Sequence, residues 1–292
     1  MTISDTASLN RRAFLSATGA LVVTLASSAD WADAASETGI VADRPPLKGD
    51  KLSSYITIDA DGTVVAYYGK IDGGQGLETS IAQMVAEEID VPFEHVRIVM
   101  GDSALTMDMG GASAAIGVSH GGMMLRRTAA EARRLLIEMA SQKLGVPASD
   151  LTVTDGVIHD VKDASKRVSY AELIGGRYFN APIKWNGKLA GALKVETTAP
   201  LKTPAEFKVI GQSYRRRDLP GKVFATLEYV NDVRLPNMLH ARMIRPAVAG
   251  AVPVKVDDAS IKDIPGAKVV WIKDLLAVVA EKEWNAVKAA KA

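Results

Sequence analysis

The chain has 292 residues, of which 35 are basic and 34 acidic, so its formal net charge is close to zero. That balance gives no electrostatic support for binding nucleic acid or an anionic membrane surface. Cysteine is absent, which removes the thiolate ligands that an iron–sulfur cluster or an attached c-type haem needs. If electrons pass through this protein, we therefore expect their carrier to lie on another chain.

Residues 1–34 have the pattern of an export leader. The pair Arg11-Arg12 precedes a mostly apolar run over residues 17–26, which is too short and too rich in Ser, Thr and Gly to act as a membrane anchor. Residues 32–34 (Ala-Asp-Ala) form the small-residue pattern that signal peptidases cleave. The arginine pair and the weakly apolar run favour the twin-arginine route over an ordinary Sec leader. We therefore expect a periplasmic protein, exported after folding.

A tether over residues 35–50 leads into the first predicted strands. Residues 55–59 and 63–68 are rich in β-branched and aromatic side chains, and the Asp61-Gly62 pair between them is a turn signal, so we expect a hairpin. A glycine-rich stretch follows. A helix is then predicted from apolar residues that recur with a period of three to four, namely Ile81, Met84, Val85 and Ile89.

A third strand, a long loop and a second helix are expected next. Residues 96–100 have the pattern of a buried strand, and residues 101–122 form a loop of a length that is usually functional or mobile inside a compact domain. From Met123 the apolar period is helical again, and Gly145 with Pro147 is a helix-stop pair.

The rest of the first half is predicted to hold less regular structure. Residues 151–158 indicate a hairpin around Asp155-Gly156, and residues 169–172 have the spacing of a capping box for a short helix that ends at Gly175-Gly176. Residues 180–218 have little pattern and are expected to be an extended connection. We expect a first domain over residues 51–200 and a linker over residues 201–220.

Residues 221–292 have the pattern of a separate α+β module. A brief helix is predicted near residues 258–263, and residues 283–291 keep a helical pattern to the last position with no stop signal. Four short strands are predicted at residues 223–229, 239–244, 268–272 and 276–280.

Two glycine-rich loops are the candidate binding sites, because each precedes a helix, where free N–H groups and the helix dipole favour an anion. The side-chain amide of Gln75 in the first loop could also form a hydrogen bond with an oxo or carbonyl group. Neither loop is a Walker A or a dinucleotide-binding motif, and each has the alternative interpretation of a simple tight turn. The candidate residues are Gly74, Gln75 and Gly76 in the first loop and Gly110, Gly111 and Ser113 in the second.

Other polar residues are weaker candidates. The four histidines match no zinc spacing, so we predict no protein-held metal, and only His120, inside the second loop, is kept as a cofactor neighbour. Asp72, Glu87 and Glu88 lie nearest the first loop, and we assign none of them as a catalytic base, because helix-surface solvation or capping is the commoner role. Three arginines at residues 215–217 have the pattern of a solvated linker.

An ordered series of segments carries a family resemblance. Residues 73–79, 82–88, 96–102, 110–113 and 125–135 resemble the molybdopterin-binding subunit of the xanthine dehydrogenase and aldehyde oxidase (molybdenum hydroxylase) family. The arrangement, with a twin-arginine leader ahead of the glycine loops, is similar to that of the isoquinoline 1-oxidoreductase β subunits. Segments at residues 221–225, 232–241 and 245–246 resemble the start of that family's α/β hammerhead domain.

The resemblance implies a function and a fold. It implies an α+β protein with a molybdopterin-binding segment and a hammerhead-like domain, acting in the hydroxylation or oxidation of an aldehyde or N-heterocycle with oxygen from water. It also implies a molybdopterin dinucleotide shared with a downstream polypeptide, a [2Fe-2S] small subunit and a cytochrome c electron acceptor. Gln75 would bond an oxo ligand of molybdenum, while the glycines and Ser113 would hold the pterin or its phosphates.

The family's catalytic glutamate lies downstream of the hammerhead domain, so the catalytic residue is unknown here. We expect this chain to be the front part of a larger subunit, with a truncated hammerhead domain over residues 221–292. The alternative is a non-catalytic fragment that holds cofactor or contacts other subunits.

Overall fold

The computed structural model describes residues 45–174 and 177–292. The predicted leader, most of the tether and the expected helix end at Gly175-Gly176 lie outside the described residues. The chain divides after Leu227 into two compact units, which are described separately below. The domain boundaries expected at residues 200 and 221 stay predictions.

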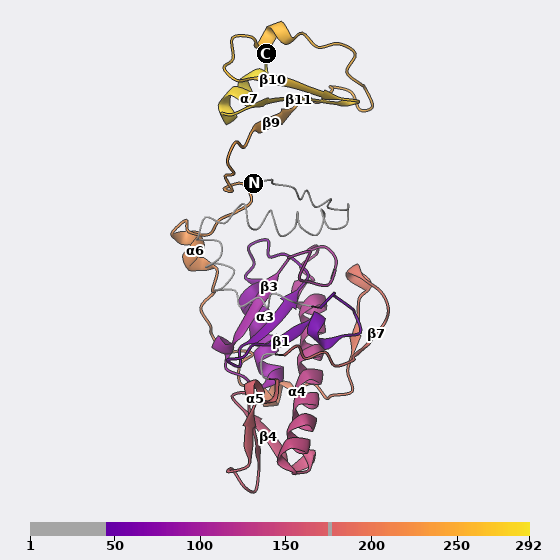
Figure 1. The fold of residues 1–292 in the computed structure, drawn as a ribbon, viewed down its shortest axis with the longest axis vertical. Coiled ribbons are helices and arrows are strands. Elements are labelled where there is room, and N and C mark those ends of the chain that lie inside the picture. The colour runs from indigo at the N-terminus through magenta and orange to yellow at the C-terminus, as the bar shows by residue number, and fades with distance from the viewer. Residues whose placement is uncertain (1–44, 175–176) are drawn as a thin grey trace, which may run out of the picture. The chain divides into compact units, whose positions relative to one another are not determined.

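The first unit is built on a three-stranded sheet with the order β1-β2-β3 (Figure 1). Strand β1 (Ile56–Ile58) pairs antiparallel with β2 (Val64–Tyr68), which confirms the predicted hairpin, and β2 pairs parallel with β3 (Val96–Met100). All five side chains of β2 are buried, as expected for a central strand. Because β2 and β3 are parallel, the chain leaves both at the same edge, so the two glycine-rich loops start there.

Two helices complete this core. Helix α3 (Leu77–Ile89) makes the crossover between β2 and β3 and packs against α4 (Met123–Leu144). Gly145 closes α4 in the left-handed conformation, with φ of 65°, and its N–H donates to Ser141 O, so the predicted stop is confirmed. A π-helical turn, η3 (Gly117–Gly122), leads directly into α4.

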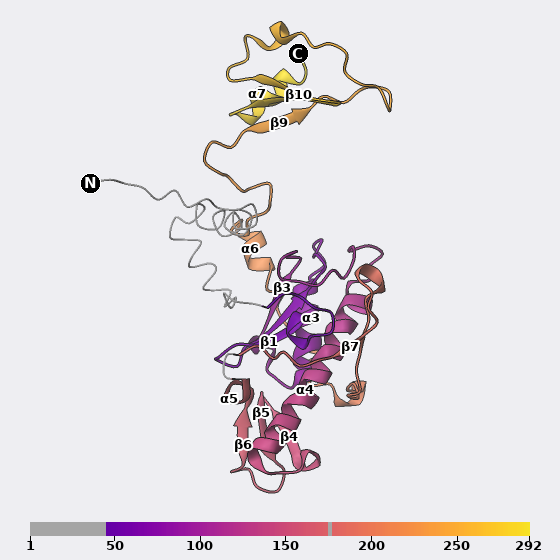
Figure 2. The ribbon, with the colours of Figure 1, turned by 45° about the vertical axis from the view of Figure 1, so that its right-hand side comes forward.

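A second sheet packs beside α4 and α5 (Figure 2). Strands β4 (Leu151–Thr154) and β5 (Val157–Asp160) form the predicted hairpin, and β6 (Arg167–Ser169), which the sequence pattern did not indicate, extends it. The predicted capping box is confirmed, because Ser169 and Glu172 exchange hydrogen bonds at the start of α5 (Tyr170–Ile174). The short strands β7 (Lys184–Trp185) and β8 (Val195–Glu196) then pair antiparallel.

The predicted strand over residues 223–229 is wrong. Residues Leu219–Val223 form a short helix, α6, with Pro220 in its first turn, and no strand follows it before Leu227. Proline has the backbone angle that a first helical turn needs, and it lacks the N–H that a sheet would use. The helix takes up only Val223 of the predicted strand, and after it the N–H groups of Thr226 and Leu227 donate to Gly221 O, so the chain turns back toward α6 instead of extending.

The second unit is an antiparallel sheet with the order β10-β11-β9 and one covering helix (Figure 1). A short 3-10 turn at Asp258–Ile261 stands where a brief helix was predicted. Val278 of the sheet, with Ile261 and Ala289, forms its small core. The elements are β9 (His240–Met243), β10 (Lys268–Ile272), β11 (Leu275–Ala280) and α7 (Glu283–Ala289). The mixture of helices and mostly antiparallel sheets is an α+β fold, as predicted.

Across the part of the chain that the structure describes, no helix is long and apolar enough to span a membrane.

Candidate functional site

The first glycine loop is held by the carboxylate of Asp72. Asp72 Oδ1 accepts from the N–H groups of Gly74 at 2.7 Å and Gly76 at 3.3 Å, and Oδ2 accepts from Leu77 N at 2.7 Å. These are the donors at the start of α3 that the sequence predicted to be free for an external anion. That prediction is wrong, because the chain supplies its own anion. The capping role expected for Asp72 is confirmed.

Arg216 fixes the other side of this loop. Its Nη2 donates to Gly74 O at 3.0 Å and pairs with Asp218 at 2.6 Å. A Cβ on Gly76 would lie 2.7 Å from Arg216 Nε, and φ of 81° at this position also requires glycine. Gln75, at the apex between the two held glycines, has an exposed side chain. The loop therefore presents the Gln75 amide on a backbone that Asp72 and Arg216 hold by hydrogen bonds.

The second glycine loop lies across the end of β2. A Cβ on Gly69 would lie 1.7 Å from Met107 O, so only glycine permits this backbone contact. The next residue, Lys70, is 3 % exposed and donates through Nζ to Gly110 O at 3.2 Å and Gly111 O at 2.9 Å. Burial lowers the pKa of Lys70, and the nearby Asp108 carboxylate opposes that change.

A pocket of about 380 Å³ opens where the second loop meets the sheet edge. It is lined by residues 69–71, by Gly101 after β3, and by loop residues that include Gly110 and Gly111. The structure therefore brings these two predicted glycines together at one pocket. Gly74, Gln75, Gly76 and Ser113 are not among its lining residues.

The remainder of the second loop has an unusual backbone. Ala114 and Ala115 both have positive φ, 50° and 56°, a conformation that costs about 1–3 kcal/mol per non-glycine residue. The π-helical turn η3 follows, and Tyr68 Oη donates to Gly117 O at 2.9 Å. Such features occur often at functional sites. His120 on this turn is exposed, with Nδ1 3.1 Å from Ser119 Oγ, and does not line the pocket.

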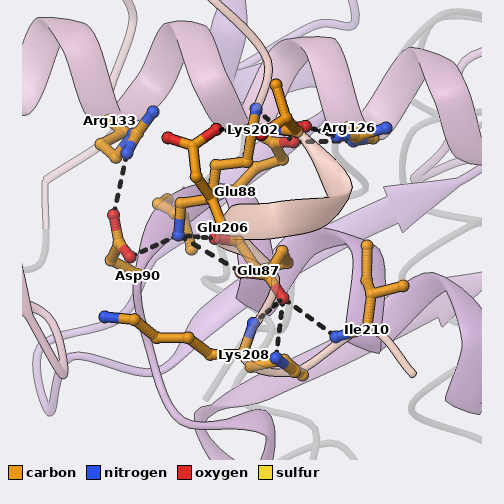
Figure 3. Close-up of polar contacts among 12 residues, drawn as sticks. Glu87, Glu88, Asp90, Arg126, Arg133, Lys202, Glu206, Lys208 and Ile210 are labelled. Carbon is orange, nitrogen blue, oxygen red and sulfur yellow. Dashed lines mark hydrogen bonds and ion pairs between the residues drawn. The ribbon is translucent and has the colours of Figure 1, made fainter. Parts of the chain in front are cut away.

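The sequence interpretation of Glu87 and Glu88 as surface or capping residues is wrong, because their side chains are 1 % and 0 % exposed. Figure 3 shows Glu87 facing residues 202–210, a segment that contains the 3-10 turn η6 (Pro204–Glu206) and that we call the strap. Glu87 Oε2 accepts from three successive strap N–H groups, those of Lys208, Val209 and Ile210, at 2.7–2.9 Å. Burial acts to raise the pKa of Glu87, but these donors and Lys202 outweigh it and hold the pKa below its ordinary value.

Glu88 and Lys202 complete this buried cluster (Figure 3). Arg126 Nε lies 2.7 Å from Glu88 Oε1, and the N–H of Lys202 donates to the same oxygen at 3.2 Å. Lys202 Nζ in turn pairs with Asp90 at 2.5 Å and Glu87 at 3.4 Å. Each buried charge thus has an opposite partner. In the sequence, the adjacent acidic residues Glu87 and Glu88 within the apolar end of α3 were the one signal that could have indicated buried ion pairs.

Arg217 also departs from the solvated linker that the sequence indicated. Its guanidinium donates to Val96 O at 2.6 Å and Phe93 O at 2.7 Å, and lies 4.1 Å from the centre of the Phe93 ring. Burial lowers the pKa of Arg217. The segment after the strap is therefore bound to the start of β3 rather than free in solvent.

Comparison with known proteins identifies the family. A model described as the molybdopterin cofactor-binding domain matches residues 31–229. The chain belongs to the molybdopterin cofactor-binding domain family. Together with the curated relatives below, the match places the chain with the molybdopterin-binding components of the xanthine dehydrogenase family.

Curated relatives extend well beyond the region that this chain matches. The chain is 37% identical to a nicotinate dehydrogenase component of Pseudomonas putida over 84% of its own length and 20% of the relative. It is 27% identical to the β component of isoquinoline 1-oxidoreductase from Brevundimonas diminuta over 99% of its length and 40% of the relative. Quinoline 2-oxidoreductase from Pseudomonas putida 86 is a structural match at 28% identity and a TM-score of 0.34, covering 42% of this chain and 16% of that one.

The loop geometry fits a molybdopterin cofactor that the backbone approaches closely. A Cβ at Gly111 would meet nothing within 4 Å, so the second loop faces open space at this position. Positions without side chains allow main-chain groups to reach the oxygens of a ligand. Within residues 45–174 and 177–292, no group of three or more His, Asp or Glu residues could hold a metal ion.

Proposed function

We propose that this chain is part of a molybdenum-dependent oxidoreductase that hydroxylates or oxidises an aldehyde or N-heterocyclic substrate, with water as the oxygen source. The family match over residues 31–229 carries the proposal. The names of two relatives support the N-heterocyclic substrate class, since nicotinate and isoquinoline are N-heterocycles. The aldehyde class is supported by the name of a third relative, the membrane-bound aldehyde dehydrogenase (pyrroloquinoline-quinone) of Gluconacetobacter polyoxogenes.

The residues of this chain would bind and orient the cofactor rather than perform the redox step. The bound molybdopterin supplies the redox chemistry. Gln75, exposed on a backbone held by Asp72 and Arg216, would donate a hydrogen bond to a polar ligand of the metal. Gly111, beside the pocket, would contact the pterin or its phosphates, and Ser113 would lie at the exposed end of the same loop.

The finer features of the assembly are also part of this proposal. The cofactor would be the dinucleotide form, shared with a downstream molybdopterin-binding polypeptide. Because the chain has no cysteine, a [2Fe-2S] small subunit would carry the electrons to a cytochrome c acceptor. Folding and cofactor loading would precede export to the periplasm through the twin-arginine route, for which the leader pattern at residues 1–34 is the support.

Metal and nucleotide analysis of the protein purified from its host tests the proposal. We expect the complex that contains this chain to hold molybdenum in stoichiometric amount and to release a nucleoside monophosphate on mild acid hydrolysis. Dye-linked oxidation of nicotinate, isoquinoline and a simple aldehyde would then define the substrate class. A stable chain without molybdenum and without associated subunits would instead support a non-catalytic binding fragment.

A further inference from the structure

Lys70 lies beneath the second glycine loop as a buried cation. Its residue is 3 % exposed, and the carbonyl oxygens of Gly110 and Gly111 accept its two hydrogen bonds. A buried ammonium is unfavourable unless polar groups surround it. The two carbonyls and the nearby charge of Asp108 provide those groups. The loop and the lysine therefore depend on each other.

The two carbonyls belong to consecutive peptide units. In a trans peptide the N–H points away from the C=O, and the described residues contain no cis peptide bond. The carbonyl of Gly110 shares its peptide plane with the N–H of Gly111, and the carbonyl of Gly111 shares its plane with the N–H of Ala112. Because Lys70 attracts both carbonyls, both N–H groups point away from Lys70.

These two N–H groups lack acceptors among the described residues. The neighbouring N–H of Gly110 differs, because it donates to Asp108 Oδ1 at 2.8 Å. Gly111 and Ala112 are both exposed, and a Cβ on Gly111 would meet nothing within 4 Å. Successive N–H groups turned to one side of a loop form a binding place for an oxyanion.

We propose that Lys70 is the positioning residue of the second glycine loop: by holding the carbonyls of Gly110 and Gly111, it presents the N–H groups of Gly111 and Ala112 to an oxyanion such as a phosphate of the cofactor. The identity of that ligand rests on the proposed function, whereas the loop geometry does not. One consequence is that Gly110 does not contact the oxyanion and acts only by binding Lys70 through its carbonyl. The two N–H groups that face the oxyanion are then those of Gly111 and Ala112.

Hydrogen exchange of the full chain without cofactor tests the positioning. Lys70→Met keeps the length of the side chain and removes the ammonium, and Lys188→Met is the control at an exposed lysine. In the wild-type chain Gly110 N donates to Asp108 Oδ1, and Ile116 N donates to Ser113 O at 3.2 Å. We expect both amides to exchange about tenfold faster or more in the Lys70 variant, because two hydrogen bonds to a charged group are lost. Amides of α4 and the control variant should keep wild-type rates.

Two results would overturn the positioning role. One is an unchanged exchange rate at Gly110 and Ile116, and the other is an equal acceleration in α4, which indicates a global loss of stability. A measurement on the wild-type chain does not depend on the variant folding: Lys70 should resist acetic anhydride while Lys188 reacts. Equal acetylation rates for the two lysines would contradict the buried contact.

The molybdenum content of the complete complex separates this inference from the proposed function. Faster loop exchange in Lys70→Met together with reduced molybdenum supports both. Faster exchange with full molybdenum supports the positioning by Lys70 and contradicts cofactor binding by this loop. Unchanged exchange contradicts the positioning, whatever the molybdenum content.

Discussion

Nε of Arg126 lies 2.7 Å from Oε1 of Glu88, and this ion pair joins the first turn of α4 to the last turn of α3. The carboxylate of Glu88 is fully buried and also accepts the N–H of Lys202 from the strap. A single buried charge therefore connects three segments that are far apart in the sequence. Removing either member leaves the other without its partner in a poorly solvated place.

We expect Arg126→Met to lower the free energy of unfolding by about 3 kcal/mol, because the buried Glu88 side chain loses its ion-pair partner. Urea denaturation followed by circular dichroism measures the change. Arg127→Met, at the next and partly exposed position of α4, is the matched control and should stay within about 0.5 kcal/mol of wild type. Equal effects of the two variants would show that the Glu88 pair contributes little.

The stability of the first unit should decrease in acid through Glu87. The pKa of Glu87 lies below its ordinary value of 4.5, so its ionisation contributes stability that is present above that value. The contribution is lost as the pH falls below 4.5 and through the lower pKa of the folded state.

Urea midpoints of wild type and Glu87→Gln between neutral pH and pH 3 check this dependence. The variant should be less stable at neutral pH and should lose less stability on acidification, because its amide does not titrate. Parallel curves for the two proteins would assign the acid sensitivity to other carboxylates, such as Glu131, whose pKa is also lowered.

Asp72→Ala should destabilise the start of α3. The carboxylate accepts three backbone N–H groups, and loss of a side-chain cap costs about 0.5–2 kcal/mol. We expect a lower urea midpoint and faster hydrogen exchange at Gly74, Gly76 and Leu77. Asp72→Asn keeps one acceptor oxygen, so its midpoint should fall between those of Asp72→Ala and wild type. A wild-type midpoint for Asp72→Ala would mean that water replaces the cap without loss.

Gln75→Ala should reduce turnover of the complete complex more than it reduces its molybdenum content. A lost hydrogen bond to a strongly polar ligand that acts in the transition state lowers the rate about ten- to a hundred-fold. Gln142→Ala removes an exposed glutamine from α4 and is the control. Unchanged kinetics with full molybdenum loading would leave the first loop with a purely structural role.

Export is predicted to depend on Arg11 and Arg12. Changing both to Lys should leave precursor in the cytoplasm, because the twin-arginine pathway distinguishes arginine from lysine at this position. Immunoblots of cytoplasmic and periplasmic fractions after induction measure the distribution. Processing at the normal rate in the variant would contradict the twin-arginine assignment and favour an ordinary Sec leader.

Local patterns predicted most of the regular structure of the first unit. The β-branched and aromatic residues of β1 and β2, the period of α3 and α4, the glycine stop at Gly145 and the capping box at Ser169 all act within a few residues, so they can be recognised without knowing the fold. The strand expected over residues 223–229 is absent, because Pro220 starts a short helix just before it and the N–H groups of Thr226 and Leu227 then bond back to Gly221 O.

The sequence by itself determined the family and the position of both glycine loops along the chain, because these depend on the order and spacing of short motifs. The tertiary structure alone decided how those loops are used. In the first loop, the carboxylate of Asp72 accepts the backbone N–H groups at the start of α3. In the second loop, Lys70 orients the backbone through the carbonyl oxygens of Gly110 and Gly111, which lie 40 and 41 residues further along the chain. The tertiary structure also buries Glu87, which was expected at the surface. Its carboxylate accepts N–H groups that lie more than 120 residues further along the chain. Periodicity describes which side of an element is apolar, but it does not tell which distant backbone group will reach a charge.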